Sequence, residues 1–321
     1  MNSENLMKNL PVKPLIAVVG ADGFVGGHLA EALQAKRVVY GPDRNGDVHI
    51  SQAERLIRDA EVIINASGFR VRPGLAYADY QRCHGGAASA FARWIQRGAL
   101  LLHISSASVL GKSKNQKLGN QAAPNPKTFP CPAYAMAKLE ADQLLQRVAA
   151  EGAFRVIFLR PAVIYAPQGA GMIDTLLGLA KRGIILRLYP RTARHHLCHM
   201  NLFVEVVRRV IQEAPADLSS LVVADPYTVS NRELDTMIRR YAPKRIMTFP
   251  LHVGLMSSLL RLSLRSRNPK LDLRTWGEIL GVLNLDTVYD PFETYRLLDI
   301  EPSNYSRDKT LQPLIEEAFH A

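Results

Sequence analysis

The sequence predicts an α/β fold: a doubly wound parallel sheet covered by helices, with a smaller cap formed mainly by the C-terminal part of the chain. Three observations support this prediction. An apolar run ends in a glycine-rich turn, strand-like runs then alternate with helical patterns, and that alternation weakens after about residue 166. Such alternation is typical of a parallel sheet with helices on both faces.

The alternation is regular over the first half of the chain. Runs rich in branched apolar residues predict strands at 14–20, 37–41, 61–68, 99–108 and 154–165. Helical spacing of apolar residues predicts helices after residue 26 and at 52–60, 88–98 and 133–152. We therefore expect a main domain over residues 14–166 and a smaller cap over residues 167–321, with segments such as 219–225 returning to the main sheet.

The chain is strongly basic, with 321 residues, a formal net charge of +11 and a pI near 9.7. This balance favours anionic partners such as nucleotide phosphates, nucleic acid or an acidic membrane surface, without choosing among them. No nucleic-acid-binding motif accompanies the charge, so we discount nucleic acid as a partner. The three cysteines are scattered, and neither a secretion signal nor a membrane-spanning run is evident, which predicts a cytoplasmic protein.

A glycine-rich turn joins the first predicted strand to the first predicted helix. Gly20 permits the tight turn, Gly23 lets the backbone approach a pyrophosphate, and Gly26 permits close packing of helix and strand. The free N–H groups at the start of the helix, around Phe24 and Val25, favour an anion there. This turn predicts a Rossmann-type domain that binds NAD or NADP.

The residue that distinguishes NAD from NADP is expected about 20 residues further on, at the end of the second strand. Asp43 is the candidate for binding a ribose 2′-hydroxyl, whereas Arg44 beside it could instead accept a 2′-phosphate. An ordinary polar turn is the alternative for both residues. We predict NAD in preference to NADP.

Two further stretches point to a family. Tyr134 and Lys138, in YAMAK, are four residues apart and therefore lie on one face of a helix. The stretch HISSASVLG ends a predicted strand with serines and precedes that helix. With the glycine turn, these motifs resemble the extended short-chain dehydrogenase/reductase superfamily, in particular the NAD-dependent nucleotide-sugar epimerase/dehydratase family. The resemblance covers about residues 14–225 and continues faintly into DPFETYRLLDIEPS.

The resemblance implies a Ser-Tyr-Lys catalytic site. Tyr134 would act as the general acid/base, and Lys138 would lower the pKa of its phenol and bind the nicotinamide ribose. Ser106 would hold the reacting oxygen, with Ser108 as the fallback, and Ser105 is expected to be structural.

Two other segments extend the predicted binding surface. By the same resemblance, Ala66 and Gly68 in INASG would lie beside the dinucleotide. Arg191 and Arg194 in RTARHHLCHMNLF would bind the pyrophosphate of a sugar nucleotide, a task suited to forked guanidinium groups. Solvated surface side chains are the alternative for both arginines. The histidines and the cysteine of 195–199 alternate between two faces if the segment is a strand, so no metal site is predicted.

The chain departs from the family pattern at two positions. Ala107 and Ser108 stand where dehydratases of the family carry an acidic pair, so dehydration is disfavoured. Epimerisation or reduction of a keto group remains. Leu110 replaces a usual tyrosine, so one substrate contact is expected to differ.

The segment 250–267, PLHVGLMSSLLRLSLRSR, has two interpretations. As an interfacial helix it could lie on an anionic bilayer, which would make lipid-linked sugars or sterols plausible substrates. As a helix of the cap, its leucines would pack on the core. The thin polar face favours the cap helix.

These observations predict an NAD(P)-dependent epimerase or oxidoreductase that acts on a nucleotide-activated sugar, by C4 epimerisation or 4-keto reduction. The alternatives are a 3β-hydroxysteroid-type or lipid-linked-substrate dehydrogenase, and a non-catalytic NAD(P)-binding sensor, which the intact Ser-Tyr-Lys set disfavours. The resemblance also implies a homodimer, paired through the helices at 88–98 and 134–150.

Overall fold

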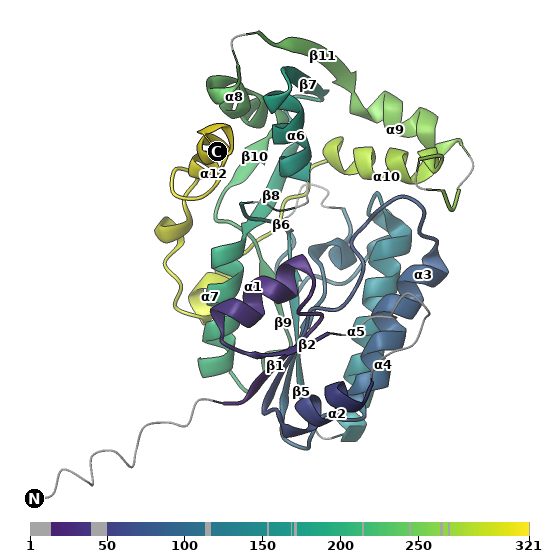
Figure 1. The fold of residues 1–321 in the computed structure, drawn as a ribbon, viewed down its shortest axis with the longest axis vertical. Coiled ribbons are helices and arrows are strands. Elements are labelled where there is room, and N and C mark those ends of the chain that lie inside the picture. Colours follow the sequence, from purple (N-terminus) through teal and green to yellow (C-terminus); the bar gives the residue numbers. More distant parts are fainter. Residues whose placement is uncertain are drawn as a thin grey trace, which may run out of the picture.

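The computed structural model of the chain describes residues 14–39, 50–112, 117–152, 154–167, 169, 172–213, 215–243, 245–263, 266–268 and 270–320. Figure 1 shows a central sheet with helices on both sides and, at one end of it, a smaller group of helices and short strands. Within the described ranges no helix is both long enough and apolar enough to cross a membrane.

A six-stranded parallel sheet forms the main domain, with strand order β2–β1–β3–β4–β5–β9. Its strands are β1 (Ile16–Val19), β2 (Lys36–Val38), β3 (Val62–Asn65), β4 (Leu100–Ile104), β5 (Arg155–Pro161) and β9 (Ser220–Val223). The predicted doubly wound parallel sheet is therefore confirmed. The strand order reverses between β1 and β3, and sheets of this kind bind ligands there, beyond the carboxyl ends of the strands. The glycine turn follows β1 at this position.

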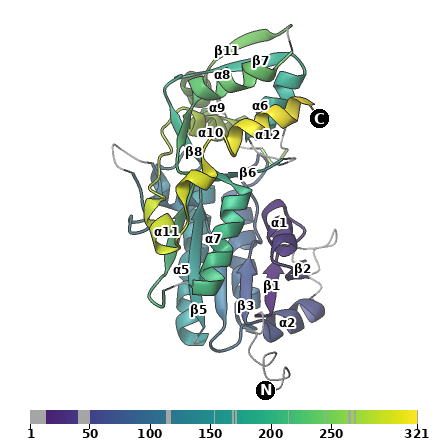
Figure 2. The same ribbon diagram turned by 90° about the vertical axis from the view of Figure 1, so that its left-hand side faces the viewer.

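Helices cover both faces of the sheet, and Figure 2 looks onto the face that α1 (Phe24–Ala32) and α7 (Met200–Glu213) cover. The opposite face is covered by α2 (Ile50–Asp59), α4 (Ala87–Ala92) and α5 (Pro132–Gly152). Alternate strand residues enter the two cores, Val18 and Ile64 on the first face and Val19 and Ile63 on the second. Burial on both faces explains why the strands read as continuous apolar runs.

The cap lies beyond the carboxyl ends of the main strands (Figure 1). It contains a three-stranded sheet, β10–β8–β6, and a two-stranded sheet, β11–β7. Its strands are β6 (Val163–Tyr165), β7 (Ile184–Tyr189), β8 (Arg194–His199), β10 (Thr228–Ser230) and β11 (Met247–His252). The C-terminal half also supplies α6 (Met172–Lys181), α8 (Asn231–Tyr241), α9 (Val253–Arg261), α10 (Leu273–Leu283), α11 (Phe292–Leu297) and α12 (Leu311–His320).

Short helical elements fill the connections. They are α3 (Tyr77–Gln81), the π-helical turn η2 (Arg82–Gly86) and the 3-10 turns η3 (Ala107–Leu110), η4 (Pro126–Thr128) and η5 (Pro302–Tyr305). The helix expected at 88–98 ends at Ala92, and the turn that follows directs Trp94 and Ile95 into the core on the α4 side of the sheet, where both are buried.

The segment 250–267 differs from the favoured interpretation. It begins as the end of strand β11 and continues as α9. Leu255 and Leu259 on α9 are 65% and 56% exposed, so they do not pack on the core. The segment thus supplies a helix of the cap, as expected, but the expectation that its leucines pack on the core is wrong for Leu255 and Leu259.

The start of α1 generates a testable prediction, because Gly26 and Gly27 are neighbours with different surroundings. A Cβ at Gly26 would lie 2.1 Å from the carbonyl oxygen of Gly20, whereas a Cβ at Gly27 would lie 3.4 Å from that of Ala21. We expect Gly26→Ala to lower the free energy of unfolding by about 1–3 kcal/mol through this backbone clash. The matched control Gly27→Ala should be neutral or slightly stabilising, since Ala is the better helix former. Urea unfolding measures both, and equal midpoints would contradict the predicted clash.

Candidate active site

The glycine turn presents backbone groups at the end of β1. The N–H of Gly20, which has a φ of 80°, donates to Val38 O over 2.9 Å, and the N–H of Gly23 donates to Gly20 O over 3.0 Å. Gly23 then caps α1 without a side-chain hydrogen bond, and the first turn carries no acidic residue. The first N–H groups of α1, from Phe24 onward, therefore have no side-chain acceptor, which suits a phosphate.

The end of β3 passes close to this turn. A Cβ at Gly20 would lie 2.8 Å from the backbone nitrogen of Ser67, so only glycine allows the two segments to approach this closely. Ala66 and Gly68 lie in the same segment after β3, and Gly68 has a φ of 142°. The turn after β1 and the segment after β3 thus lie against each other at the switch point of the sheet.

Helix α5 brings the three predicted catalytic side chains together at the end of β4. The side chain of Ser106 lies beside the phenol of Tyr134, and their interaction favours a lower pKa of that phenol. One turn further along α5, the ammonium of Lys138 donates to Ile104 O over 2.9 Å. Ser108, the predicted fallback, donates its hydroxyl to Ser106 Oγ over 2.9 Å. Ser106 is therefore the serine that contacts Tyr134, and Ser108 supports it.

Burial is the main cause of the pKa shifts of Tyr134 and Lys138. It raises the pKa of Tyr134 to about 12, and the interaction with Ser106 opposes that shift only in part. Burial also lowers the pKa of Lys138 to about 8, while the nearby Asp142 and Cys83 favour its ammonium form. The chain alone therefore keeps Tyr134 protonated at neutral pH.

A buried polar network lies behind these residues. Ser105 donates its hydroxyl to Asp142 Oδ2 over 2.8 Å, and Arg160 lies 3.9 Å from the same oxygen. His103 Nε2 lies 3.6 Å from Asp142 Oδ1, and His103 Nδ1 is 2.8 Å from the amide nitrogen of Asn65. The amide must donate, so Nδ1 accepts and the ring proton lies on Nε2, facing the carboxylate. The network ties α5 to the ends of β3, β4 and β5.

His84 also lies at the site, although no motif predicted it. It sits on η2 and is 1% exposed, and neither ring nitrogen finds a hydrogen-bond partner among the described residues. Its ring centroid is 5.6 Å from that of Tyr134. A Cβ at Gly68 would lie 2.5 Å from His84 Nδ1 and 3.4 Å from Lys138 Nζ, so both nitrogens border the same small space. Burial and the charge of Lys138 lower the pKa of His84 and keep the ring neutral.

Arg37 is a second residue that sequence reasoning missed. It lies on β2, and its guanidinium donates a hydrogen bond to the carbonyl of Ala21 in the glycine turn. Asp43 and Arg44, the predicted determinants of cofactor choice, lie outside the described residues. Arg37 thus places a positive charge beside the turn, from a position where the sequence pattern predicted only a strand.

The sequence of the whole nucleotide-binding region matches a known family. A sequence model of the NAD dependent epimerase/dehydratase family matches residues 16–224. This chain belongs to that family. The predicted membership is thereby confirmed, and the glycine turn, Ser106, Tyr134 and Lys138 all lie within the matched region.

Individual relatives are more distant. The UDP-glucose 4-epimerase of Vibrio cholerae is 26% identical over 102 residues, which are 32% of this chain and 31% of that relative. The UDP-glucuronic acid 4-epimerase of Bacillus cereus, solved with UDP-glucuronic acid and NAD, has a TM-score of 0.71 at 15% identity, over 95% of this chain and 98% of that one. RMD from Pseudomonas aeruginosa, complexed with NADPH, has a TM-score of 0.68 at 14% identity, over 96% of this chain and 99% of that one. At these identities the solved structures show a shared fold.

The two arginines predicted to bind a sugar nucleotide lie in the cap of this family member. Arg191 forms an ion pair with the buried Asp235, with an N–O distance of 3.0 Å. Arg194, on β8, donates to Thr228 Oγ1 over 2.8 Å and is exposed. Arg194 therefore retains the more accessible guanidinium, and the binding role of both arginines stays a prediction.

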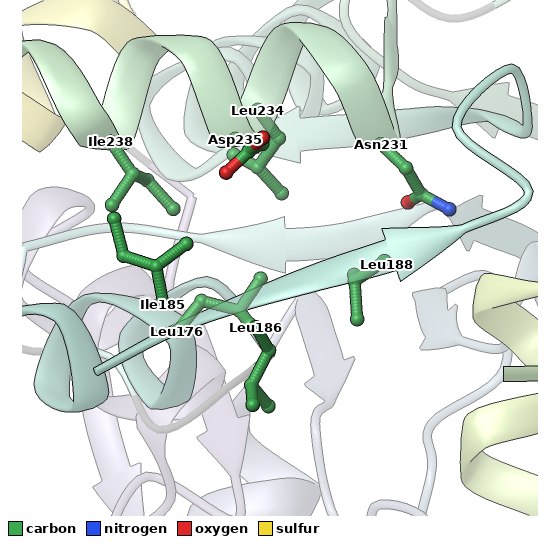
Figure 3. A pocket seen from close by; sticks show the side chains of 8 residues that line it. All are labelled: Leu176, Ile185, Leu186, Leu188, Asn231, Leu234, Asp235 and Ile238. Atoms are coloured by element: carbon green, nitrogen blue, oxygen red, sulfur yellow. The ribbon is translucent and has the colours of Figure 1, made fainter. Parts of the chain in front are cut away.

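A small pocket in the cap lies between α6, β7 and α8, and Figure 3 shows its largely aliphatic lining. The polar lining groups are already partnered. Asn231 donates to Pro190 O and to Leu283 O, and Asp235 pairs with Arg191. The pocket is therefore part of the core of the cap, and the candidate active site remains at Tyr134.

The buried network predicts a pH effect on stability. Burial raises the pKa of Asp142 from 3.8 to about 6, so the folded state holds this proton more tightly than the unfolded state does. The contribution of protonated Asp142 to the free energy of unfolding is fully present below pH 4 and is lost as the pH rises through 6. Relative to Asp142→Asn, the wild type should lose about 1–3 kcal/mol of unfolding free energy between pH 4 and pH 7. Urea unfolding of both proteins across that range measures the difference. A relative gain of stability in the wild type would contradict the raised pKa.

Proposed function

We propose that this family member is an NAD(P)-dependent enzyme that acts on a nucleotide-activated sugar, by C4 epimerisation or 4-keto reduction. The observation that supports this most directly is the grouping of Ser106, Tyr134 and Lys138 beside the glycine turn. The printed names of the relatives give further support, since they include 4-epimerases of UDP-sugars and a structure with NAD.

Each residue of the group has a chemical task in this proposal. Tyr134 is protonated at neutral pH, so it holds the proton that is exchanged with the substrate hydroxyl or carbonyl oxygen. Ser106 orients the phenol and the same substrate oxygen. Lys138 binds the nicotinamide ribose, and its positive charge favours the phenolate once the proton has left. The dinucleotide, when bound, supplies the carbon that accepts or donates hydride and a positive charge in its oxidised form.

The residues next to Ser106 bear on the type of reaction. Ala107 and Ser108 provide no carboxyl group to protonate a leaving hydroxyl, so we do not propose a dehydratase. Epimerisation and keto reduction both need only the hydride and the proton of Tyr134. In epimerisation the keto intermediate must also rotate within the site, so that hydride can return to its opposite face.

The choice of cofactor is a separate part of the proposal. We favour NAD, with Asp43 binding the ribose 2′-hydroxyl. Arg37 and Arg44 are the residues that would instead favour NADP, because each can pair with a 2′-phosphate. We also propose that the protein acts in the cytoplasm as a homodimer that pairs through α4 and α5.

A dehydrogenase for a lipid-linked or steroid-like alcohol is a second candidate function. The surroundings of Tyr134 favour it in one respect, because Val71 and Leu75 line the same hollow and offer an apolar contact. Thr275 and Glu278 of α10 also line that hollow. A non-catalytic NAD(P)-binding sensor remains the least favoured candidate, because it would have no use for the grouping of Ser106, Tyr134 and Lys138.

The main test combines ligand binding with turnover. Purified protein with NAD or NADP should show a rise in thermal midpoint with one series of UDP-, dTDP- or GDP-sugars, since only ligands of the native state stabilise it. With the sugar that binds, Tyr134→Phe should lower kcat by about 10²–10⁴-fold, because the proton donor is lost. Tyr77→Phe is the matched control on α3 and should retain kcat within twofold. A midpoint shift only with sterols or a lipid-phosphate sugar would instead favour the second candidate.

His84 generates a further prediction about the same site. We propose that this neutral ring accepts a hydrogen bond, directly or through water, from Lys138 or from the cofactor ribose in the space beside Gly68. His84→Leu removes the acceptor but keeps a buried apolar group. It should lower kcat about tenfold. It should also move the alkaline limb of the pH profile to lower pH, because the Lys138 ammonium loses a hydrogen-bond acceptor and its pKa falls.

His84→Asn is the matched variant, since its amide can still accept a hydrogen bond. It should recover much of the activity and the position of the alkaline limb. If His84→Leu lowers kcat and thermal midpoint together while the pH profile is unchanged, the role of His84 is one of packing only.

A further inference from the structure

The surface formed by β11, α9 and α10 is unusually apolar. Among the described residues, thirteen large hydrophobic side chains are exposed, and nine of them lie between residues 247 and 276. We call these nine the apolar surface: Met247, Phe249, Leu255, Met256, Leu259, Leu262, Leu271, Leu273 and Trp276. Figure 1 shows α9 and α10 side by side at the edge of the cap. Such a concentration of exposed apolar groups is typical of an interaction surface.

Small residues allow α9 and α10 to approach each other closely. Ser257 of α9 is buried and donates its hydroxyl to Gly277 O of α10 over 2.7 Å. A Cβ at Gly277 would lie 2.8 Å from Leu260 Cβ, so the helices pack as closely as their backbones allow. Leu255, Leu259 and Leu262 point away from this contact, and Leu262 is 85% exposed. The hairpin is thus closely packed within itself at Ser257, Leu260 and Gly277, while Leu255, Leu259 and Leu262 remain exposed.

Exposed positive charges occur in the same stretch of chain as the apolar residues. Arg245, Arg267, Lys270 and Arg274 are exposed in the same part of the chain. The acidic residues between 245 and 284 are Asp272 and Glu278, and both are buried. Arg267 and Arg274 approach carboxylates at 3.5 and 4.0 Å, yet their side chains stay 78% and 50% exposed. The surface therefore combines exposed apolar side chains with an excess of exposed positive charge, which we call the positive rim.

We propose that the apolar surface docks onto an anionic lipid bilayer. Its leucines and Trp276 would enter the boundary between headgroups and acyl chains, and the surrounding cations would contact acidic headgroups. A second copy of the chain fits less well. A two-fold contact through this surface would bring the positive rim of one copy against the same rim of the other.

The surface and the candidate active site share α10. Asp272 accepts a hydrogen bond from the backbone N–H of Gly74 over 2.8 Å, which fixes the start of α10 against the segment before α3. Thr275 and Glu278 line the hollow beside Tyr134, while Trp276 between them is 45% exposed. Docking would therefore bring α10, which borders the site, to the bilayer. The docking itself does not rest on the proposed reaction, and its test needs no activity.

The test is the binding of the full chain to vesicles of phosphatidylcholine alone or with 30% phosphatidylserine, about the order of content that gives cytoplasmic leaflets their negative potential. We expect co-sedimentation with the acidic vesicles that weakens at high salt, and little with the neutral ones. Tryptophan fluorescence should shift to the blue on binding, because Trp276 leaves water while Trp94 is already buried. The double variant Leu259→Gln/Leu262→Gln should lower the partition coefficient at least tenfold, and Lys270→Glu at least fivefold.

Leu297→Gln is the matched control, because Leu297 is an exposed leucine on α11, outside the apolar surface. It should bind vesicles as the wild type does, and thermal melts should show that all variants fold. Equal binding by the wild type and the double variant would overturn the proposal. So would an absence of vesicle binding, or a dimer in analytical ultracentrifugation that the double variant dissociates.

Discussion

A buried carboxylate in α5 is the constraint on which the candidate active site depends. Asp142 lies one helical turn after Lys138 and two turns after Tyr134, on the same side of α5. Its contacts with Ser105 after β4 and Arg160 on β5 hold that side of the helix against the sheet. A buried charge is costly unless partners surround it, so a rotation of α5 that removed these partners would be strongly unfavourable. The orientation of α5 that pairs Asp142 is the one that presents the phenol and the ammonium to the end of β4.

The parts of the site that could be predicted from sequence are those whose chemistry is local. The need for glycine at positions 20 and 26 arises within one turn and the helix that follows it. The structure shows the close backbone approaches that require Gly20 and Gly26. Tyr134 and Lys138 share a face because they are four residues apart in one helix. The alternation of strands and helices predicted the parallel sheet for the same reason, since each strand-helix unit is readable within a window of about 20 residues.

The parts that sequence did not reveal depend on contacts between distant segments. His84 joins the site only because η2 packs beside α5, and nothing in RCHGG predicts that contact. Arg37 reaches the glycine turn across the β1–β2 pair, although its own strand reads as an ordinary element. The prediction that the leucines of α9 are buried was wrong for a related reason. Its leucine spacing is compatible with a core helix, and the small residues Ser257 and Gly277, which decide the inner side, lie on two different helices.

The two sides of α10 link the identity of the substrate to the place where the protein works. Thr275 and Glu278 border the hollow at Tyr134, and Trp276 belongs to the apolar surface on the other side. A nucleotide sugar is freely diffusing and would gain nothing from a site held beside a bilayer. A sugar carried on a lipid diphosphate would gain a raised local concentration there, and the same Ser106, Tyr134 and Lys138 chemistry would act on its ring. Docking on vesicles would therefore shift the balance toward lipid-carried substrates, while its absence would leave the nucleotide sugar as the better supported substrate.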